Sequence, residues 1–172
     1  MGDRLKDKVV LITGASGGIG KSFALRFAGE GAKLLLTTTS PQRAEGTLKE
    51  IKATGAKAVF VKCDISKEAD CNNLAAEAEK TYGRVDVLVN NAAIWAGIDI
   101  TPWDKWTLDD WERIFRVNVF GTWLVCKAIV PMMIKQGKGK IINIASNVAK
   151  QPAAQVFFPY ACSKGAMYTF TH

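Results

Sequence analysis

The sequence predicts a doubly wound α/β fold, in which helices cover both faces of a parallel sheet. Five short aliphatic and β-branched runs alternate with longer helical patterns from one end of the chain to the other. These runs are apolar nearly throughout, as expected of parallel strands that are buried on both faces. With 172 residues, of which 48% are hydrophobic and 23% charged, the chain has the size and composition of a globular domain.

The elements follow one another in a regular order. Runs such as Val9-Val10-Leu11-Ile12 predict the strands, and Pro159 suits the first turn of the last helix because its missing N–H would have no helical partner there. We expect strands over Lys8–Thr13, Lys33–Thr37, Ala58–Lys62, Val85–Asn90 and Lys140–Ala145. We expect helices over Gly18–Gly29, Gln42–Thr54, Lys67–Tyr82, Leu108–Lys135 and Pro159–His172. No repeat or linker marks a second domain, so residues 1–172 are expected to form a single one.

The chain is basic, with a net charge of +7 from 23 Lys and Arg against 16 Asp and Glu. Such a charge suits nucleic acid, a membrane surface or an anionic ligand. The lysines are scattered, and only the loop from Lys135 to Lys140 approaches a cluster. We therefore expect a solvated surface with a bias towards anions such as a phosphate-bearing cofactor, and no nucleic-acid groove.

Cysteine and histidine usage argues against a metal site. Cys63, Cys71, Cys126 and Cys162 show no C-x-x-C spacing, and the one histidine is the last residue, so neither a structural zinc site nor a histidine-based triad is predicted. The N-terminus lacks a signal-peptide core, and no apolar run is expected to reach the length of a membrane span. These features predict free thiols, a cytoplasmic location and no membrane association.

A glycine-rich turn follows the first strand. In Thr13-Gly14-Ala15-Ser16-Gly17-Gly18-Ile19-Gly20 the glycines permit a sharp turn and a close approach of backbone to a ligand. The helix that follows offers unpaired N–H groups and a partial positive charge to a pyrophosphate. Glycine-rich turns also occur without a ligand, but the strand, loop and helix context favours dinucleotide binding.

Tyr160 and Lys164 are four residues apart at the start of the last helix, so they should share one face. An ammonium beside a phenol favours the phenolate, and we expect Lys164 to lower the pKa of Tyr160 towards a range useful for proton transfer. An ordinary solvated helix face has the same spacing. These two residues alone do not decide between the two interpretations.

The motifs occur in the order typical of one enzyme family. The T-G-x-x-x-G-I-G pattern ending at Gly20 resembles the cofactor loop of the classical short-chain dehydrogenase/reductase family, which has a Rossmann fold. Asp64 after the third strand resembles the aspartate that contacts adenine, and Asn90-Asn91-Ala92-Ala93 resembles the N-N-A-G motif with alanine in place of glycine. Asn118, Ser146 and the pair of Tyr160 and Lys164 resemble the catalytic residues.

The resemblance implies a hydride transfer between NAD(P)(H) and a carbonyl or secondary alcohol. Tyr160 would be the general acid or base, Ser146 would bind the substrate oxygen, and Lys164 would also bind the nicotinamide ribose. Asn118 would hold a water in a proton relay. Cofactor contacts are implied for Gly14, Ser16, Gly18, Ile19, Gly20, Thr38, Thr39, Asp64, Ile65, Asn91, Ala92, Tyr160 and Lys164.

Each of these polar residues also has a purely structural interpretation. Ser146 could be a turn residue at a strand end, and Asn118 could be a buried amide that pairs with backbone. Asp64 could cap a strand, and Asn90 and Asn91 could stabilise a turn. Their joint order along the chain favours the catalytic interpretation.

The cofactor preference depends on the end of the second strand. An acidic residue there would select NAD by binding the ribose 2′-OH, but the sequence has Thr37-Thr38-Thr39-Ser40. Hydroxyl groups accommodate a 2′-phosphate, with help from Arg43 or Lys33, so NADP(H) is slightly favoured over NAD(H). Gly17 argues the other way, because NADP-preferring relatives often carry a basic residue at that position.

The resemblance also implies that the fold is incomplete at its C-terminal end. The expected strand order is 3-2-1-4-5, and the final two strands of the family are absent, which would leave the fifth strand as an exposed apolar edge. An oxidoreductase is the leading hypothesis, and the alternative is a truncated dinucleotide-binding module without turnover. A homodimer or homotetramer is implied, with the helices Leu108–Lys135 and Pro159–His172 as the contact face.

Two aromatic loops are expected near the substrate. Ile94–Thr107 carries Trp95, Trp103 and Trp106, and Asn147–Phe158 carries Phe157 and Phe158. Both follow strand ends, where ligands bind in such folds, and they favour an apolar substrate. A role as core lids or subunit contacts is equally compatible with their composition.

Overall fold

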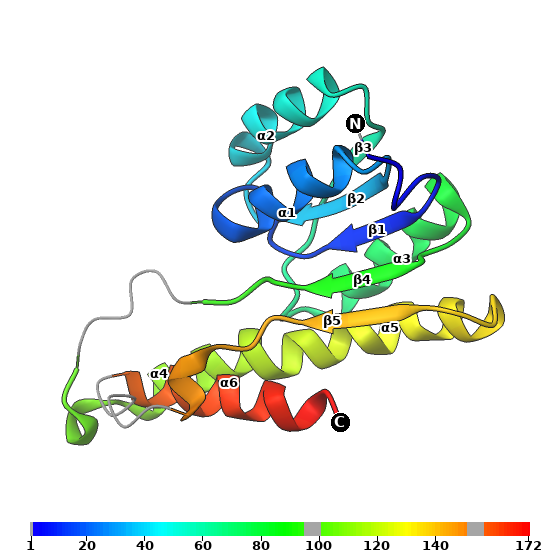
Figure 1. Cartoon of the computed structure of the whole chain (residues 1–172). Coiled ribbons are helices and arrows are strands. Elements are labelled where there is room, and N and C mark those ends of the chain that lie inside the picture. Colours follow the sequence, from blue (N-terminus) through cyan, green and yellow to red (C-terminus); the bar gives the residue numbers. More distant parts are fainter. Residues whose placement is uncertain (1, 95–100, 151–156) are drawn as a thin grey trace.

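The computed structural model describes residues 2–94, 101–150 and 157–172. Five parallel strands form a single sheet in the order β3-β2-β1-β4-β5, which confirms the predicted topology (Figure 1). The strands are β1 (Val9–Ile12), β2 (Lys33–Thr38), β3 (Ala58–Lys62), β4 (Val87–Asn90) and β5 (Lys140–Asn143). Each begins and ends within a few residues of the predicted range.

Helices cover both faces of this sheet, as predicted. They are α1 (Gly18–Ala28), α2 (Pro41–Ala53), α3 (Glu68–Tyr82), α4 (Leu108–Phe115), α5 (Thr122–Lys135) and α6 (Phe158–Phe170). Short 3₁₀ turns occur at η1 (Trp103–Lys105) and η3 (Asn147–Lys150). In Figure 1 the orange and red segments η3 and α6 lie beside the green α4.

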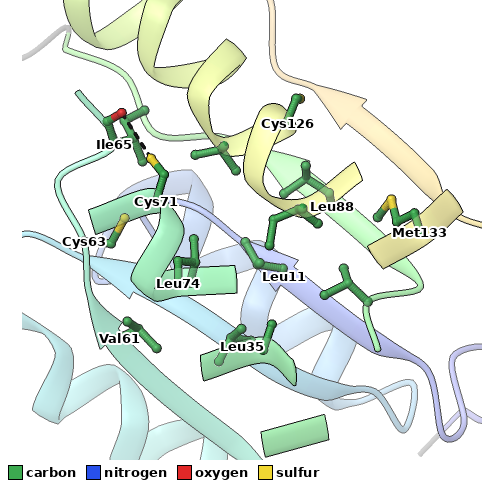
Figure 2. Packing of buried hydrophobic residues seen from close by; sticks show 14 residues of the cluster. Leu11, Leu35, Val61, Cys63, Ile65, Cys71, Leu74, Leu88, Cys126 and Met133 are labelled. Atoms are coloured by element: carbon green, nitrogen blue, oxygen red, sulfur yellow. Dashed lines mark hydrogen bonds between the residues drawn. The ribbon is translucent and has the colours of Figure 1, made fainter. Parts of the chain in front are cut away.

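Alternate residues of the strands pack into two separate hydrophobic cores, one on each face of the sheet. On β1, Val10 and Ile12 pack with residues of α1 and α2, whereas Leu11 packs with residues of α3 and α5. This is the period of two that a strand imposes on its side chains. Figure 2 shows the second core, with Leu11, Leu35 and Leu88 of the sheet beside Leu74 of α3 and Met133 of α5.

The helix expected over Leu108–Lys135 contains a π-helical segment, η2 (Arg116–Gly121), that the apolar pattern does not reveal. At its end the backbone passes very close to the loop after β3, since a Cβ on Gly121 would lie 2.8 Å from Cγ1 of Ile65. Segments of π-helix often occur at functional sites. Asn118 lies inside this segment.

The same helical stretch corrects the expectation about membrane-spanning length. By length and composition alone Leu108–Lys135 would suffice to cross a membrane. In the fold, 44% of its most apolar window is buried, and Val125, Ile129 and Met133 of α5 belong to the core beside α3. The continuity of α4, η2 and α5 produces the length, and packing against α3 and the sheet accounts for much of the apolar character.

Among residues 2–94, 101–150 and 157–172, the fifth strand lies at the edge of the sheet and pairs with β4 alone. The side chains of Ile141 and Ile142 on this strand are 41% and 43% exposed. In the described structure these side chains form an exposed apolar surface beside the strand edge.

Candidate active site

The glycine-rich turn is held tightly against the loop after β4. Gly14 has a φ of +65°, and a Cβ there would lie 2.9 Å from Cα of Ala92. The amide of Gly14 donates a hydrogen bond to Oγ1 of Thr37 at 3.1 Å. A Cβ on Gly20 would collide with the carbonyl oxygen of Gly14. Glycine is thus required at 14 by conformation and contact, and at 20 by contact.

Thr13 and Asn91 join the ends of β1 and β4. Oγ1 of Thr13 accepts hydrogen bonds from the amides of Asn91 and Ala92, both at 3.0 Å. Nδ2 of Asn91 donates to the carbonyls of Thr13 and Gly14 at 2.9 and 3.1 Å. Asn91 therefore stabilises the turn, as its purely structural interpretation predicted. Both hydrogens of its Nδ2 are donated to backbone carbonyls of the loop.

A cavity of about 450 Å³ opens at the carboxyl ends of β1, β2, β3 and β4. This is the edge where ligands bind in doubly wound sheets. Among the predicted cofactor residues, its lining includes Gly14, Ser16, Thr38, Thr39, Asp64, Ile65, Asn91 and Ala92.

Several lining residues were not predicted, namely Thr37, Cys63, Ala93, Ile94 and Val117. Cys63 follows β3 directly, and Thr37 is the next-to-last residue of β2. Ala93 and Ile94 lie in the loop after β4, so nearness to a strand end was a signal for these four. Val117 lies in η2, and its place at the cavity had no such signal. Gly18, Ile19 and Gly20 are not among the lining residues; they form the first turn of α1, where the side chain of Ile19 is 62% exposed.

The hydroxyl groups at the end of β2 are not equivalent. Thr38 is buried, and its Oγ1 donates to the carbonyl of Ser40 at 2.9 Å and accepts from the amide of Ser40 at 3.0 Å. Thr39 is exposed at the cavity, so its hydroxyl is the better placed of the two for a ligand.

The suggestion that Lys33 assists a 2′-phosphate is wrong. Lys33 is the first residue of β2 and pairs with Asp7 at 3.1 Å. It therefore lies at the opposite end of the strand from Thr38, about 16 Å away at the usual rise per residue.

Asp64 combines a structural role with its place in the cavity wall. Its Oδ1 accepts hydrogen bonds from the amide and the hydroxyl of Ser66 at 3.1 and 2.7 Å. Its own amide donates to the carboxylate of Asp70 at 2.9 Å. This turn holds Asp64 and Ile65 at the cavity.

The predicted catalytic residues form a second group, on α6 and the end of β5. The side chains of Tyr160 and Ser146 share a hydrogen bond. Lys164 is buried, and its Nζ donates to the carbonyl of Ile144 at 2.7 Å and lies 5.8 Å from the centre of the Tyr160 ring.

The ionisation of this group differs from the expectation. Burial raises the pKa of Tyr160 above its usual value, opposed by the hydrogen bond with Ser146, so the predicted lowering by Lys164 is wrong for this structure. Burial lowers the pKa of Lys164 to about 8, because its ammonium is taken out of water.

Asn118 connects the two groups. Its Oδ1 accepts a hydrogen bond from the amide of Ile94 at 2.8 Å, and its Nδ2 donates to the hydroxyl of Ser163 at 3.0 Å. Ile94 lines the cavity, and Ser163 donates to the carbonyl of Tyr160 at 2.7 Å. Asn118 is thus a buried amide that pairs with backbone, as its purely structural interpretation predicted.

The aromatic loops are only partly described. Trp95 lies outside the described residues. Trp103 is 69% exposed, whereas Phe158 packs edge-on against Trp111 of α4 with ring centres 5.5 Å apart. Phe158 therefore contributes to helix packing.

A glycine-rich turn at the carboxyl edge of a doubly wound parallel sheet is the arrangement of the Rossmann-like folds. The short chain dehydrogenase family model matches residues 8–172. The chain belongs to this family.

Relatives and solved structures agree with this assignment. The chain is 39% identical over 169 residues to glucose 1-dehydrogenase 2 of Bacillus subtilis (strain 168), covering 97% of this chain and 64% of the relative. It matches the crystal structure of an NAD⁺-bound xylitol dehydrogenase with a TM-score of 0.91 and 32% identity, covering 98% of this chain and 64% of that one. It also matches a metagenomic short-chain oxidoreductase in complex with NADP, with a TM-score of 0.86 and 33% identity, covering 96% of this chain and 74% of that one. The chain spans 60–64% of the length of the curated relatives it matches.

Proposed function

We propose that the protein is an oxidoreductase that transfers a hydride between NAD(P)(H) and a carbonyl or secondary alcohol. The observation that carries the proposal is the hydrogen-bonded pair of Tyr160 and Ser146 beside the buried Lys164. A dinucleotide suits the cavity, because its lining includes Gly14 and Ser16 of the glycine-rich turn that leads into α1 and the exposed Thr39. Bound nicotinamide would supply or accept the hydride.

The residues of the chain would handle the proton. The raised pKa of Tyr160 keeps its phenol protonated at neutral pH, which suits donation to a carbonyl oxygen. The Ser146 hydroxyl, already paired with Tyr160, would donate to the same oxygen and stabilise the charge that develops on it. Lys164, close to the Tyr160 ring, would bind the nicotinamide ribose hydroxyls. Asn118 would hold a relay water.

The cofactor preference and the substrate are parts of the same proposal. NADP(H) is slightly favoured because no acid follows β2 and Thr39 is exposed there. An apolar small-molecule carbonyl or alcohol suits the aromatic residues near η1 and α6.

Assembly and location remain predictions. A homodimer or homotetramer is supported by the outward side chains of Phe120, Trp123 and Ile134 on η2 and α5, which are 56%, 49% and 73% exposed. A cytoplasmic location, and the lack of nucleic-acid and membrane partners, rest on the sequence alone.

Replacing Tyr160 with phenylalanine tests the proposal. We expect NADPH binding, followed by fluorescence titration, to be retained and turnover of a panel of apolar ketones to fall by about 100-fold or more. Tyr168→Phe is the matched control, because Tyr168 is exposed on the same helix and should tolerate the change. Full turnover by Tyr160→Phe would refute the assignment, and wild-type binding without turnover would support the dinucleotide-binding module instead.

A further inference from the structure

Two buried thiols belong to one hydrophobic core at the wall of the cavity, which Cys63 helps to line. Cys63 follows β3 directly and Cys71 lies on α3, and the residues are 2% and 0% exposed. Figure 2 shows them near each other, with Sγ of Cys71 donating to the carbonyl of Ile65 at 3.4 Å.

We propose that Cys63 and Cys71 form a reversible disulfide that responds to peroxide and weakens cofactor binding. The effect on the cofactor rests on the proposed function, whereas the disulfide itself does not. Disulfides in reducing compartments are usually transient and regulatory, which fits a thiol pair buried in the core of a protein predicted to be cytoplasmic.

A small oxidant can reach this pair through the cavity. Cys63 is one of the cavity-lining residues, and Cys71 lies behind it. Interaction between the two thiols lowers the pKa of Cys71 and, together with burial, raises that of Cys63, because the thiol of Cys63 stabilises a thiolate on its neighbour. We therefore assign the attack on the oxidant to Cys71 and the resolving step to Cys63.

The reaction balances with hydrogen peroxide as the oxidant. One thiolate attacks a peroxide oxygen, the O–O bond breaks, and the departing hydroxide takes up the thiol proton as water, leaving a sulfenic acid. The second sulfur then attacks the sulfenic sulfur, the S–O bond breaks, and a second water leaves as the S–S bond forms. Two thiols and one peroxide therefore give one disulfide and two waters, with the sulfurs supplying both electrons.

The disulfide would disturb the cavity. Sγ of Cys71 must leave the carbonyl of Ile65, and the closed loop would contain Asp64 and Ile65, both of which line the cavity. Ile65 has little room to adjust, since its side chain and carbonyl lie directly against Gly121. We therefore expect the oxidised chain to bind the dinucleotide less tightly.

Peptide mapping of the whole chain tests the disulfide. After treatment with hydrogen peroxide and blocking of free thiols, trypsin should release residues 63–67 joined to residues 68–80, because Lys62, Lys67 and Lys80 are cleavage sites. Dithiothreitol should separate the two peptides. Cys63→Ser should abolish the joined species, and Cys126→Ser, which changes another buried cysteine of the same core, should retain it.

Fluorescence titration with NADPH then tests the consequence. We expect about tenfold weaker binding by the oxidised chain, recovery on reduction, and no effect of peroxide on binding by Cys63→Ser. Absence of the joined peptide, or sulfinic acid at either cysteine in its place, would overturn the proposal. Unchanged NADPH affinity with the disulfide present would overturn its regulatory part. A reduced chain that forms the disulfide on oxidation but never binds NADPH would overturn the proposed function and leave the disulfide established.

Discussion

Replacing Lys164 with methionine should stabilise the fold while removing turnover. Lys164 is 4% exposed, and burial lowers its pKa from an ordinary 10.5 to about 8. At about 1.4 kcal/mol for each tenfold change, keeping this ammonium charged costs the folded state about 3 kcal/mol. Methionine has a similar length and no charge. It loses the hydrogen bond to the carbonyl of Ile144, worth about 1 kcal/mol. We expect a net gain of about 2 kcal/mol at pH 7.

The sign of the pH dependence follows from the lowered pKa. Below pH 8 the lysine is protonated in both the folded and the unfolded chain, so the cost is fully present. Between pH 8 and pH 10.5 the folded lysine is mostly neutral while the unfolded one stays charged, so the folded state gains stability as the pH rises. The advantage of Lys164→Met should therefore shrink over this range.

Urea unfolding at pH 7 and at several values up to pH 10 measures this difference. Lys49→Met, on the exposed face of α2, is the control and should show no such trend. A variant less stable than the wild type at pH 7, or a stability difference that does not change with pH, would refute the reasoning.

Two glycine substitutions test the cavity. Gly17→Arg should raise the affinity for NADPH relative to that for NADH by about tenfold in a titration, because Gly17 has an extended backbone with open space around its Cβ position and arginine pairs well with phosphate. Gly17→Glu should reverse this preference. Equal effects of the two variants on the cofactor preference would contradict the reasoning. Gly20→Ala should lower the free energy of unfolding by about 1–3 kcal/mol and weaken NADPH binding, because the added methyl meets the carbonyl of Gly14. The matched control Gly46→Ala, in a helix with open space, should stabilise by up to about 1 kcal/mol, so equal unfolding energies for the two variants would argue against the contact.

The sequence predicted the sheet because each strand is an uninterrupted apolar run. Leu34, Leu35 and Leu36 are all fully buried, which is possible only when both faces of the sheet are covered. The glycine-rich turn was equally predictable from the sequence. A positive φ at Gly14 and a close contact at Gly20 leave few residue types other than glycine that these positions tolerate.

Features that depend on tertiary packing could not be predicted in the same way. The π-helical segment around Asn118 follows an ordinary apolar helical pattern, and its contact with Ile65 joins residues far apart in the chain. The ionisation of Tyr160 was predicted wrongly because spacing on a helix shows proximity to Lys164 but not how deeply either side chain is buried.

The position of Asn118 explains how the cavity wall and the helix that carries Tyr160 are held together. Its side chain bonds to the amide of Ile94 in the cavity wall and to Ser163, which in turn bonds to the carbonyl of Tyr160. Asn118 and Ser163 are 1% and 0% exposed, so breaking this series would leave buried polar groups without partners. The amide of Asn118, on the π-helical segment, thus connects the cavity wall at Ile94 to the backbone that carries Tyr160. These hydrogen bonds join two halves of the site that share no strand pairing.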